Sequence, residues 1–296
     1  MISLVLLIGI YFGIYALLAL GQNLITGMTG LLSLCQAAFM AIGAYTTAII
    51  LTSHHPLPLA ELIVIVVFMG SLFGAMIGLP TLRLKGDYLA IASLGFGEIV
   101  KNVLLNADKF TGGPMGITHI PSVQLGRILI SPYDKSVYLI FVWGFVGVIL
   151  WGLFRLQRSR FGRALEAIRE DEVAASSLGL NTTLYKVVAF MIGAAISALA
   201  GMLWAIYNGS VIPQSFDFML SIMVLCMVVL GGLGNYFAAL VGTMVIVIIS
   251  ELPRLLGFSV LIPAQLDQIL FGLILVILMI YRPEGLLGRP VSKRNS

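Results

Sequence analysis

A series of long apolar runs constrains this chain more than any other feature of its sequence. A bilayer core of ~30 Å is crossed by about 20 mostly apolar residues in a helix. Runs of that length recur along the 296 residues, of which 59% are hydrophobic and only 10% charged. That composition excludes an ordinary soluble domain, and the short alternating segments of an outer-membrane barrel are absent. We therefore predict an all-α, polytopic transmembrane helical bundle, with about 8–10 spans.

The apolar runs can be placed individually. The first begins without a preceding positive segment, which favours a membrane helix over a cleaved signal peptide. The predicted spans are 2–20, 30–51, 60–80, 88–106, 136–154, 187–207, 218–232, 237–256 and 266–281.

Basic residues in the links between spans orient the chain. Of the 17 lysines and arginines, 12 fall on one side, including those of 155–186 and of the C-terminus, and five on the other. The positive-inside rule puts the richer side in the cytoplasm and the N-terminus outside. We expect a single transmembrane domain over 1–288, with a cytoplasmic loop at 155–186 and a short cytoplasmic tail at 289–296.

The region 21–51 is long for one crossing, and Gly27, Thr29, Gly30 and Ser33 interrupt its first part. It is either a link followed by a tilted helix, or a broken, partly re-entrant segment. Irregular backbone at membrane depth is tolerated only where protein buries it or where it lines a cavity. Gln36 is therefore a candidate for the substrate path if the segment is broken, and otherwise a hydrogen-bonding group between helices.

Charged residues inside a span need a reason, because burying them in lipid is costly. Glu98 lies in the predicted span 88–106, with Lys101 and Asn102 on the same helical face. The favoured interpretation is a Glu98–Lys101 pair near the outer interface. The alternative is that Glu98 and Asn102 line a substrate path.

Small residues repeat at four-residue spacing within two spans. Such stripes allow close helix packing in lipid, more often inside one bundle than at a dimer seam. They are Gly70, Gly74 and Gly78, and Gly193, Ser197 and Gly201.

Enzyme signatures are absent from the sequence. It contains no phosphate-binding P-loop, no zinc-protease motif and no serine-hydrolase motif. Cys35 and Cys226 lie in apolar runs, and the three histidines lack metal-ligand spacing. We predict a protein with no catalytic residue, no metal site and no nucleic-acid partner, because membrane orientation explains its basic residues.

The stretch 155–186 holds ten of the thirty charged residues. Its composition favours a helix from Phe161 to about Leu178, which Gly179 would end. One face of this helix is apolar except for Glu172, which lies in its middle. The helix rests on the membrane surface or docks in a partner's groove, and the acidic cluster 170–172 favours docking.

Several blocks of the sequence resemble one family of transport proteins. EDEVAASSLGL at 170–180 looks like the cytoplasmic loop with which ABC importer permeases touch their ATPase subunit. RLKGDYLAIASLGFGEIVKN (83–102), TGGPMGI (111–117), FGRALEAIREDEVAASSLGLN (161–181) and VLGGLGNYFAALVG (229–242) resemble the branched-chain amino acid permease family. Their order matches its LivM-like type, from about residue 20 to about 288.

The resemblance implies a permease subunit of an ABC importer in a bacterial cytoplasmic (inner) membrane, with the C-terminus in the cytoplasm. The implied partners are cytoplasmic ATPase subunits, a second homologous permease subunit and a periplasmic or lipid-anchored binding protein, which would meet the outer loop 107–135. The substrate would be a branched-chain or other hydrophobic amino acid, and membrane lipid would surround the bundle. ATP would be bound by the partner, so this chain would need no cofactor.

The same resemblance implies that 161–179 couples ATP hydrolysis to transport. The predicted coupling residues are Phe161, Gly162, Leu165, Ile168, Glu172, Ala174, Ala175 and Gly179. One alternative is a permease of the same type for urea or short amides. Another is an ion-coupled secondary transporter, which the scarcity of paired membrane charges disfavours.

Overall fold

A computed structural model describes residues 2–53, 57–81, 87–125, 128–130 and 134–255. The predicted span 266–281, the tail 289–296 and the basic residues Arg83 and Lys85 lie outside the described residues.

Eight long helices coincide with the other eight predicted spans. They are α1 (Ile2–Gln22), α2 (Gln36–Thr52), α3 (Leu59–Thr81), α4 (Asp87–Asn106), α6 (Lys135–Gln157), α9 (Thr182–Asn208), α10 (Phe218–Gly231) and α11 (Tyr236–Leu255). A π-helical turn, η1 (Asn23–Met28), extends α1. Six segments of the described chain are long and apolar enough to cross a membrane, while α2 and the apolar part of α11 are shorter. The prediction of an all-α membrane bundle is confirmed.

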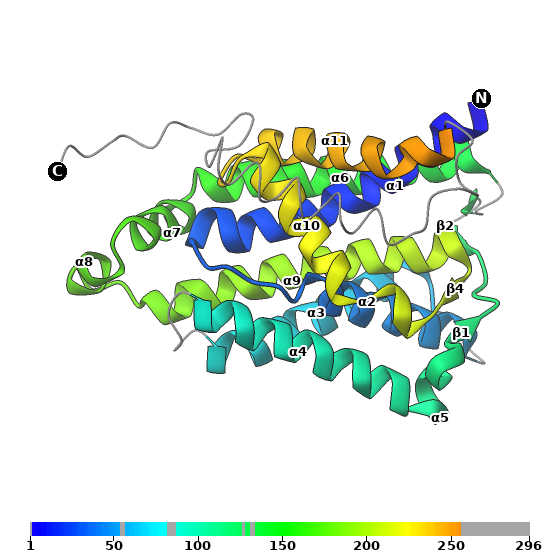
Figure 1. The fold of residues 1–296 in the computed structure, drawn as a ribbon, viewed down its shortest axis with the longest axis horizontal. Coiled ribbons are helices and arrows are strands. Elements are labelled where there is room, and N and C mark those ends of the chain that lie inside the picture. The colour runs from blue at the N-terminus through cyan, green and yellow to red at the C-terminus, as the bar shows by residue number, and fades with distance from the viewer. Residues whose placement is uncertain (1, 54–56, 82–86, 126–127, 131–133, 256–296) are drawn as a thin grey trace.

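Short elements gather at the two ends of the bundle. At one end lie α5 (Asp108–Thr111), η2 (Gly113–Met115), β1 (Ile117–Thr118), β2 (Val123–Leu125), β3 (Ile128–Ile130), β4 (Ser210–Val211) and η3 (Pro213–Ser215). Strand β1 pairs antiparallel with β4, and β2 with β3. At the opposite end lie α7 (Arg160–Glu170) and α8 (Glu172–Ser177) (Figure 1).

Helix α9 runs through the centre of the bundle. It packs against α2 and α3 on one side and against α1 on the other (Figure 1). Helix α1 in turn packs against α6, α10 and α11. Elements far apart in the sequence therefore meet around a single long helix.

Small residues make this close packing possible. A Cβ atom on Gly70 would lie 2.7 Å from Cβ of Ala198, and one on Gly74 would lie 2.8 Å from Cβ of Ala194. Likewise, a side chain at Gly43 of α2 would collide with the backbone of Ala198. The glycine stripes therefore form seams inside the bundle, as the sequence predicted.

The outward face of α3 is apolar. Its large exposed side chains recur about once per turn, at Val64, Phe68, Leu72, Met76 and Leu79. A soluble helix would place charged groups on such a face. This face instead suits contact with lipid tails.

Replacing Gly43 by alanine is expected to destabilise the bundle by about 1–3 kcal/mol, because the added methyl group forces α2 away from α9. The midpoint of thermal unfolding of the detergent-solubilised protein measures this. Gly147→Ala is the control, because a Cβ there meets nothing within 4 Å. Equal midpoints for the two variants would contradict a tight α2–α9 seam.

Candidate functional site

The chain is broken between α1 and α2. The π-helical turn ends at Met28 with Thr29 as its C-cap, still in helical conformation, and helix resumes at Gln36; residues 30–35 form neither helix nor strand. Thr29 and Ser33 are buried, whereas Gly30 is exposed. The region 21–51 is not one continuous helix, because non-helical residues separate the end of η1 from α2. The π-helical turn that precedes the break is itself an irregularity that occurs often at functional sites.

Side chains from neighbouring elements satisfy the backbone of this broken segment, residues 29–35. The Gln22 amide donates through Nε2 to the Ser33 carbonyl oxygen at 2.8 Å. The Leu34 N–H donates to Oγ of Ser93, on α4, at 2.9 Å. Such bonds take the place of the helical ladder that the segment has lost.

Gln36 lies where the broken segment becomes α2. Its Oε1 accepts a hydrogen bond from the Ser197 hydroxyl of α9, and the next backbone N–H, of Ala37, donates to Oγ of Ser221 at 3.0 Å. The Nε2 of Gln36 is fully buried and has no hydrogen-bond partner in the described part of the chain. A buried amide donor without a partner is costly, which makes it a candidate for contact with a transported molecule.

Glu98 and Asn102 lie farther along α4, beyond Ser93. Asn102 is exposed and its side chain donates to the backbone carbonyl of Glu98 at 2.8 Å. Within the described ranges Glu98 and Lys101 form no ion pair, contrary to the favoured interpretation. The α4 residue that contacts the break is Ser93, which the sequence analysis did not select.

Three serines that bond to residues 34–37, namely Ser93, Ser197 and Ser221, were difficult to recognise from the sequence. Serines within apolar helices commonly bond to their own backbone. Ser93 does so, donating to the Ala90 carbonyl at 2.9 Å, and Ser197 does so at Gly193. Their second role, toward residues 34–37, depends on which helices are neighbours.

The polar stretch forms two helices where one was predicted. Helices α7 and α8 are separated at Asp171, whose backbone is extended (φ −153°, ψ 104°). The Asp171 carboxylate accepts hydrogen bonds from the N–H groups of Val173 and Ala174, at 2.9 and 3.0 Å. An aspartate that caps a new helix is favourable there, so the single helix 161–178 was wrong. Gly179 ends α8 with a positive φ of 85°, as predicted.

The apolar face of α7 and α8 is turned toward the protein's own membrane bundle. Leu165, Ile168 and Ala175 are buried, and the ring of Phe161 stacks on Tyr185 of α9 with centroids 5.3 Å apart. Gly162 is buried as well. The predicted coupling residues on this face are therefore covered by their own chain.

The opposite face is exposed and partly apolar. Val173 is 69% exposed and Leu178 is 84% exposed. Ala174 and Gly179, two of the predicted coupling residues, are exposed beside them. Apolar side chains that face water together can form a contact surface for a partner, whereas single ones are ordinary.

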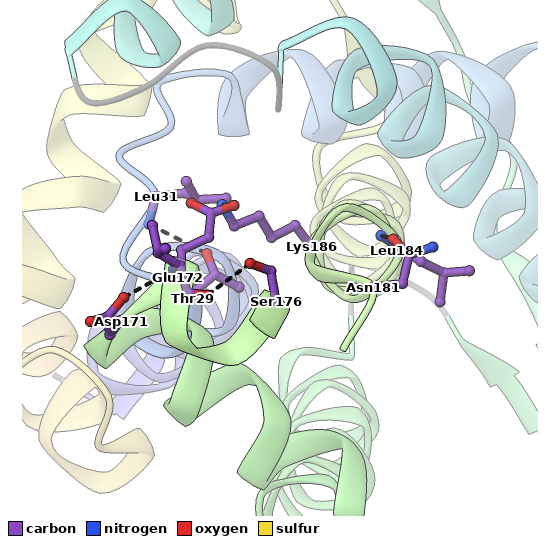
Figure 2. Close-up of polar contacts among 9 residues, drawn as sticks. Thr29, Leu31, Asp171, Glu172, Ser176, Asn181, Leu184 and Lys186 are labelled. Carbon is purple, nitrogen blue, oxygen red and sulfur yellow. Dashed lines mark hydrogen bonds and ion pairs between the residues drawn. The ribbon is translucent and has the colours of Figure 1, made fainter. Parts of the chain in front are cut away.

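Glu172 forms an ion pair within the chain. Its Oε1 lies 2.5 Å from Nζ of Lys186 in the first turns of α9, and the two side chains are 42% and 6% exposed. Figure 2 shows the Glu172 carboxylate and the Lys186 ammonium meeting. The charge in the middle of the apolar face is therefore explained by a buried lysine of the same protein, and not by a groove on a partner.

The sequence that builds this site matches a known protein family. Residues 4–279 match the family described as the permease component of branched-chain amino acid transport systems. The chain belongs to this family.

Similar proteins support the assignment. The permease is 40% identical to the high-affinity branched-chain amino acid transport system permease protein LivM of Salmonella typhimurium, covering 96% of this chain and 70% of that protein. It is also 40% identical to LivM of Escherichia coli (93% and 68%), and 28% identical to BraD of Pseudomonas aeruginosa (93% and 92%). No solved structure matches. The permease is a multi-pass helical membrane protein and a non-catalytic transport subunit.

Removing the carboxylate of Glu172 is expected to destabilise the permease more than removing both charges of the pair. Glu172→Ala leaves Lys186 charged and nearly buried, at a cost of about 1–3 kcal/mol for a half-exposed pair. Glu172→Ala combined with Lys186→Met removes the uncompensated charge. Thermal unfolding in detergent measures both variants, and a double variant as unstable as the single one would contradict this account.

Replacing Gln36 by methionine, which keeps its volume, is expected to lower substrate uptake severalfold while leaving the amount of protein in the membrane unchanged. The reason is the loss of the unpartnered Nε2 donor at the break. Uptake of labelled leucine by cells that hold the complete transporter measures the effect. Thr47→Val, a buried change on the same helix, is the control. Normal uptake by the Gln36 variant would limit this residue to a structural role.

Proposed function

We propose that this permease is the membrane-spanning subunit of an ATP-driven importer that carries branched-chain amino acids across a bacterial cytoplasmic membrane. The names of its relatives and their 40% identity over most of the chain support the substrate class. The excess of basic residues supports a cytoplasmic location for 155–186 and for the C-terminus. The N-terminus of α1 lies at the end of the bundle opposite α8 (Figure 1), in agreement with this orientation.

ATP is proposed to bind to separate ATPase subunits, so that the permease needs no cofactor of its own. The sequence has no P-loop. One observation carries the docking proposal: α7 and α8 bury their apolar face against the bundle, yet Val173 and Leu178 remain exposed to water. We assign the contact with the ATPase to these two residues together with Ala174 and Gly179.

The other predicted coupling residues take a different role under this proposal. Phe161, Gly162, Leu165, Ile168 and Ala175 hold the two helices against α9 and the end of α1. Glu172 attaches α8 to α9 through Lys186. Movement imposed on α8 by an ATPase would therefore reach the bundle through packed side chains and one ion pair.

A substrate-binding protein is proposed to dock at the opposite end of the bundle, on the loop 107–135. Two large apolar side chains there, Phe110 and Met115, are exposed. The β1–β4 pairing ties this loop to the end of α9. A second homologous permease subunit would complete the transporter, and substrate would pass Gln36, with Glu98 and Asn102 as further candidates along α4.

Pull-down of the permease from detergent-solubilised membranes tests the proposal. The wild type is expected to bring down an ATPase subunit, and Leu178→Glu is expected to lose both that subunit and leucine uptake, because a buried unpaired charge opposes docking. Leu184→Glu is the matched control, since Leu184 is also exposed but lies on the side of α9 away from Glu172 (Figure 2).

Absence of any ATPase from the wild-type sample would contradict the proposal. The substrate class is checked in the same cells. Unlabelled isoleucine should compete with leucine uptake, whereas competition by urea or acetamide alone would favour the amide alternative.

A further inference from the structure

Arg169 of α7 lies where the coupling region meets the broken segment. Its Nη1 donates a hydrogen bond to the carbonyl oxygen of Gly27, in the last residues of η1. Its Cγ lies 3.2 Å from the position that a Cβ on Gly30 would occupy. Gly30 has a φ of +73°, a conformation that other residues rarely adopt. The side chain thus spans the point at which helix ends and irregular backbone begins.

The chemistry of the contact between Arg169 and Gly27 favours a strong hydrogen bond. The last carbonyl groups of a helix have no partner within it and carry partial negative charge. A guanidinium group is a permanent cation with several donors in a rigid plane. Arg169 therefore holds the end of the α1–η1 helix by a charge-assisted hydrogen bond, which is stronger than a neutral one.

The junction around this bond is tightly packed. The Gly234 N–H donates to Oδ1 of Asn23 at 2.9 Å, and a Cβ on Gly234 would lie 2.8 Å from Nη1 of Arg169. A Cβ on Gly27 would lie 2.5 Å from the Gly234 nitrogen. Arg169 is exposed as a whole, but its guanidinium group reaches this closely packed junction, and closely packed regions transmit displacement.

The other end of the broken segment is attached to the proposed substrate path. Leu34 is bonded to Ser93 of α4, and Gln36 is bonded to Ser197 of α9. Residues 29–35 therefore connect the contact of Arg169 directly to Gln36.

We propose that Arg169 is the positioning residue that transmits movement of α7 and α8 to the broken segment, so that ATPase engagement changes the exposure of residues 33–36. The inference rests on the proposed function, because it requires an ATPase at α8. It adds a specific route, in which movement of the Arg169 guanidinium group displaces the Gly27 carbonyl to which it is bonded. This route differs from a general tilt of whole helices.

Cys35 provides a native reporter for this movement. It is the last residue of the broken segment and is fully buried. With Cys226, the other cysteine of the chain, replaced by alanine, the rate of alkylation by N-ethylmaleimide measures the exposure of Cys35. The rate is measured in the complete complex with its ATPase subunits, without nucleotide and with ATP and vanadate.

In the permease that carries only Cys226→Ala, we expect ATP and vanadate to change the alkylation rate of Cys35 severalfold. Arg169→Met keeps the stem that packs on Gly30 but removes the donor, and it is expected to abolish the nucleotide effect while the ATPase still co-purifies. Arg169→Lys retains a cationic donor and is expected to restore part of the effect. Arg163→Met, an exposed change on the same helix, should behave like the unchanged protein.

The inference would be overturned if the nucleotide effect persisted in Arg169→Met. It would also be overturned if the permease that carries only Cys226→Ala showed no nucleotide effect. Loss of the ATPase from Arg169→Met would also overturn it, since Arg169 would then belong to the docking surface. These outcomes differ from failure of the proposed function, in which the unchanged permease would bring down no ATPase at all.

Discussion

Backbone groups inside a membrane must find hydrogen-bond partners within the protein, because lipid offers none. Residues 31–35 lack the helical ladder that meets this requirement elsewhere in the bundle. The Ser93 hydroxyl and the Gln22 amide supply the missing partners from α4 and α1. Helices that are distant in sequence are therefore linked by hydrogen bonds to one short segment. The same bonds stabilise the non-helical backbone of that segment.

Helix α9 links this segment to the region that faces the cytoplasm under the proposed function. Ser197, which bonds to Gln36, and Lys186, which pairs with Glu172, lie on the same helix, about 16 Å apart along its axis at 1.5 Å per residue. The glycine and alanine seams let α2 and α3 approach α9 closely, so their positions relative to α9 are tightly constrained. Helix α9 therefore contacts both the proposed coupling site, through Lys186 near its start, and the proposed path, through Ser197 near its middle.

The eight long helices could be predicted from the apolar runs of the sequence, because a run of about 20 apolar residues is what a membrane crossing requires. The glycine seams could also be predicted, since small residues at four-residue spacing have few other uses in lipid. The single helix 161–178 was wrong because average propensity does not register that Asp171 can cap a second helix. The Glu98–Lys101 pair was wrong because neighbours on a helical face need not bond.

The sequence by itself determined the class of protein, the helical segments and the family, since hydrophobicity and motif order are properties of the chain alone. It also identified the apolar face of the coupling region, but not what covers that face, because periodicity does not reveal the neighbour. Only the tertiary structure decided that the bundle itself buries Leu165 and Ile168, that Lys186 neutralises Glu172, and that Arg169 reaches Gly27. Each of these contacts joins residues brought together by the packing around α9, and a one-dimensional pattern carries no information about that packing.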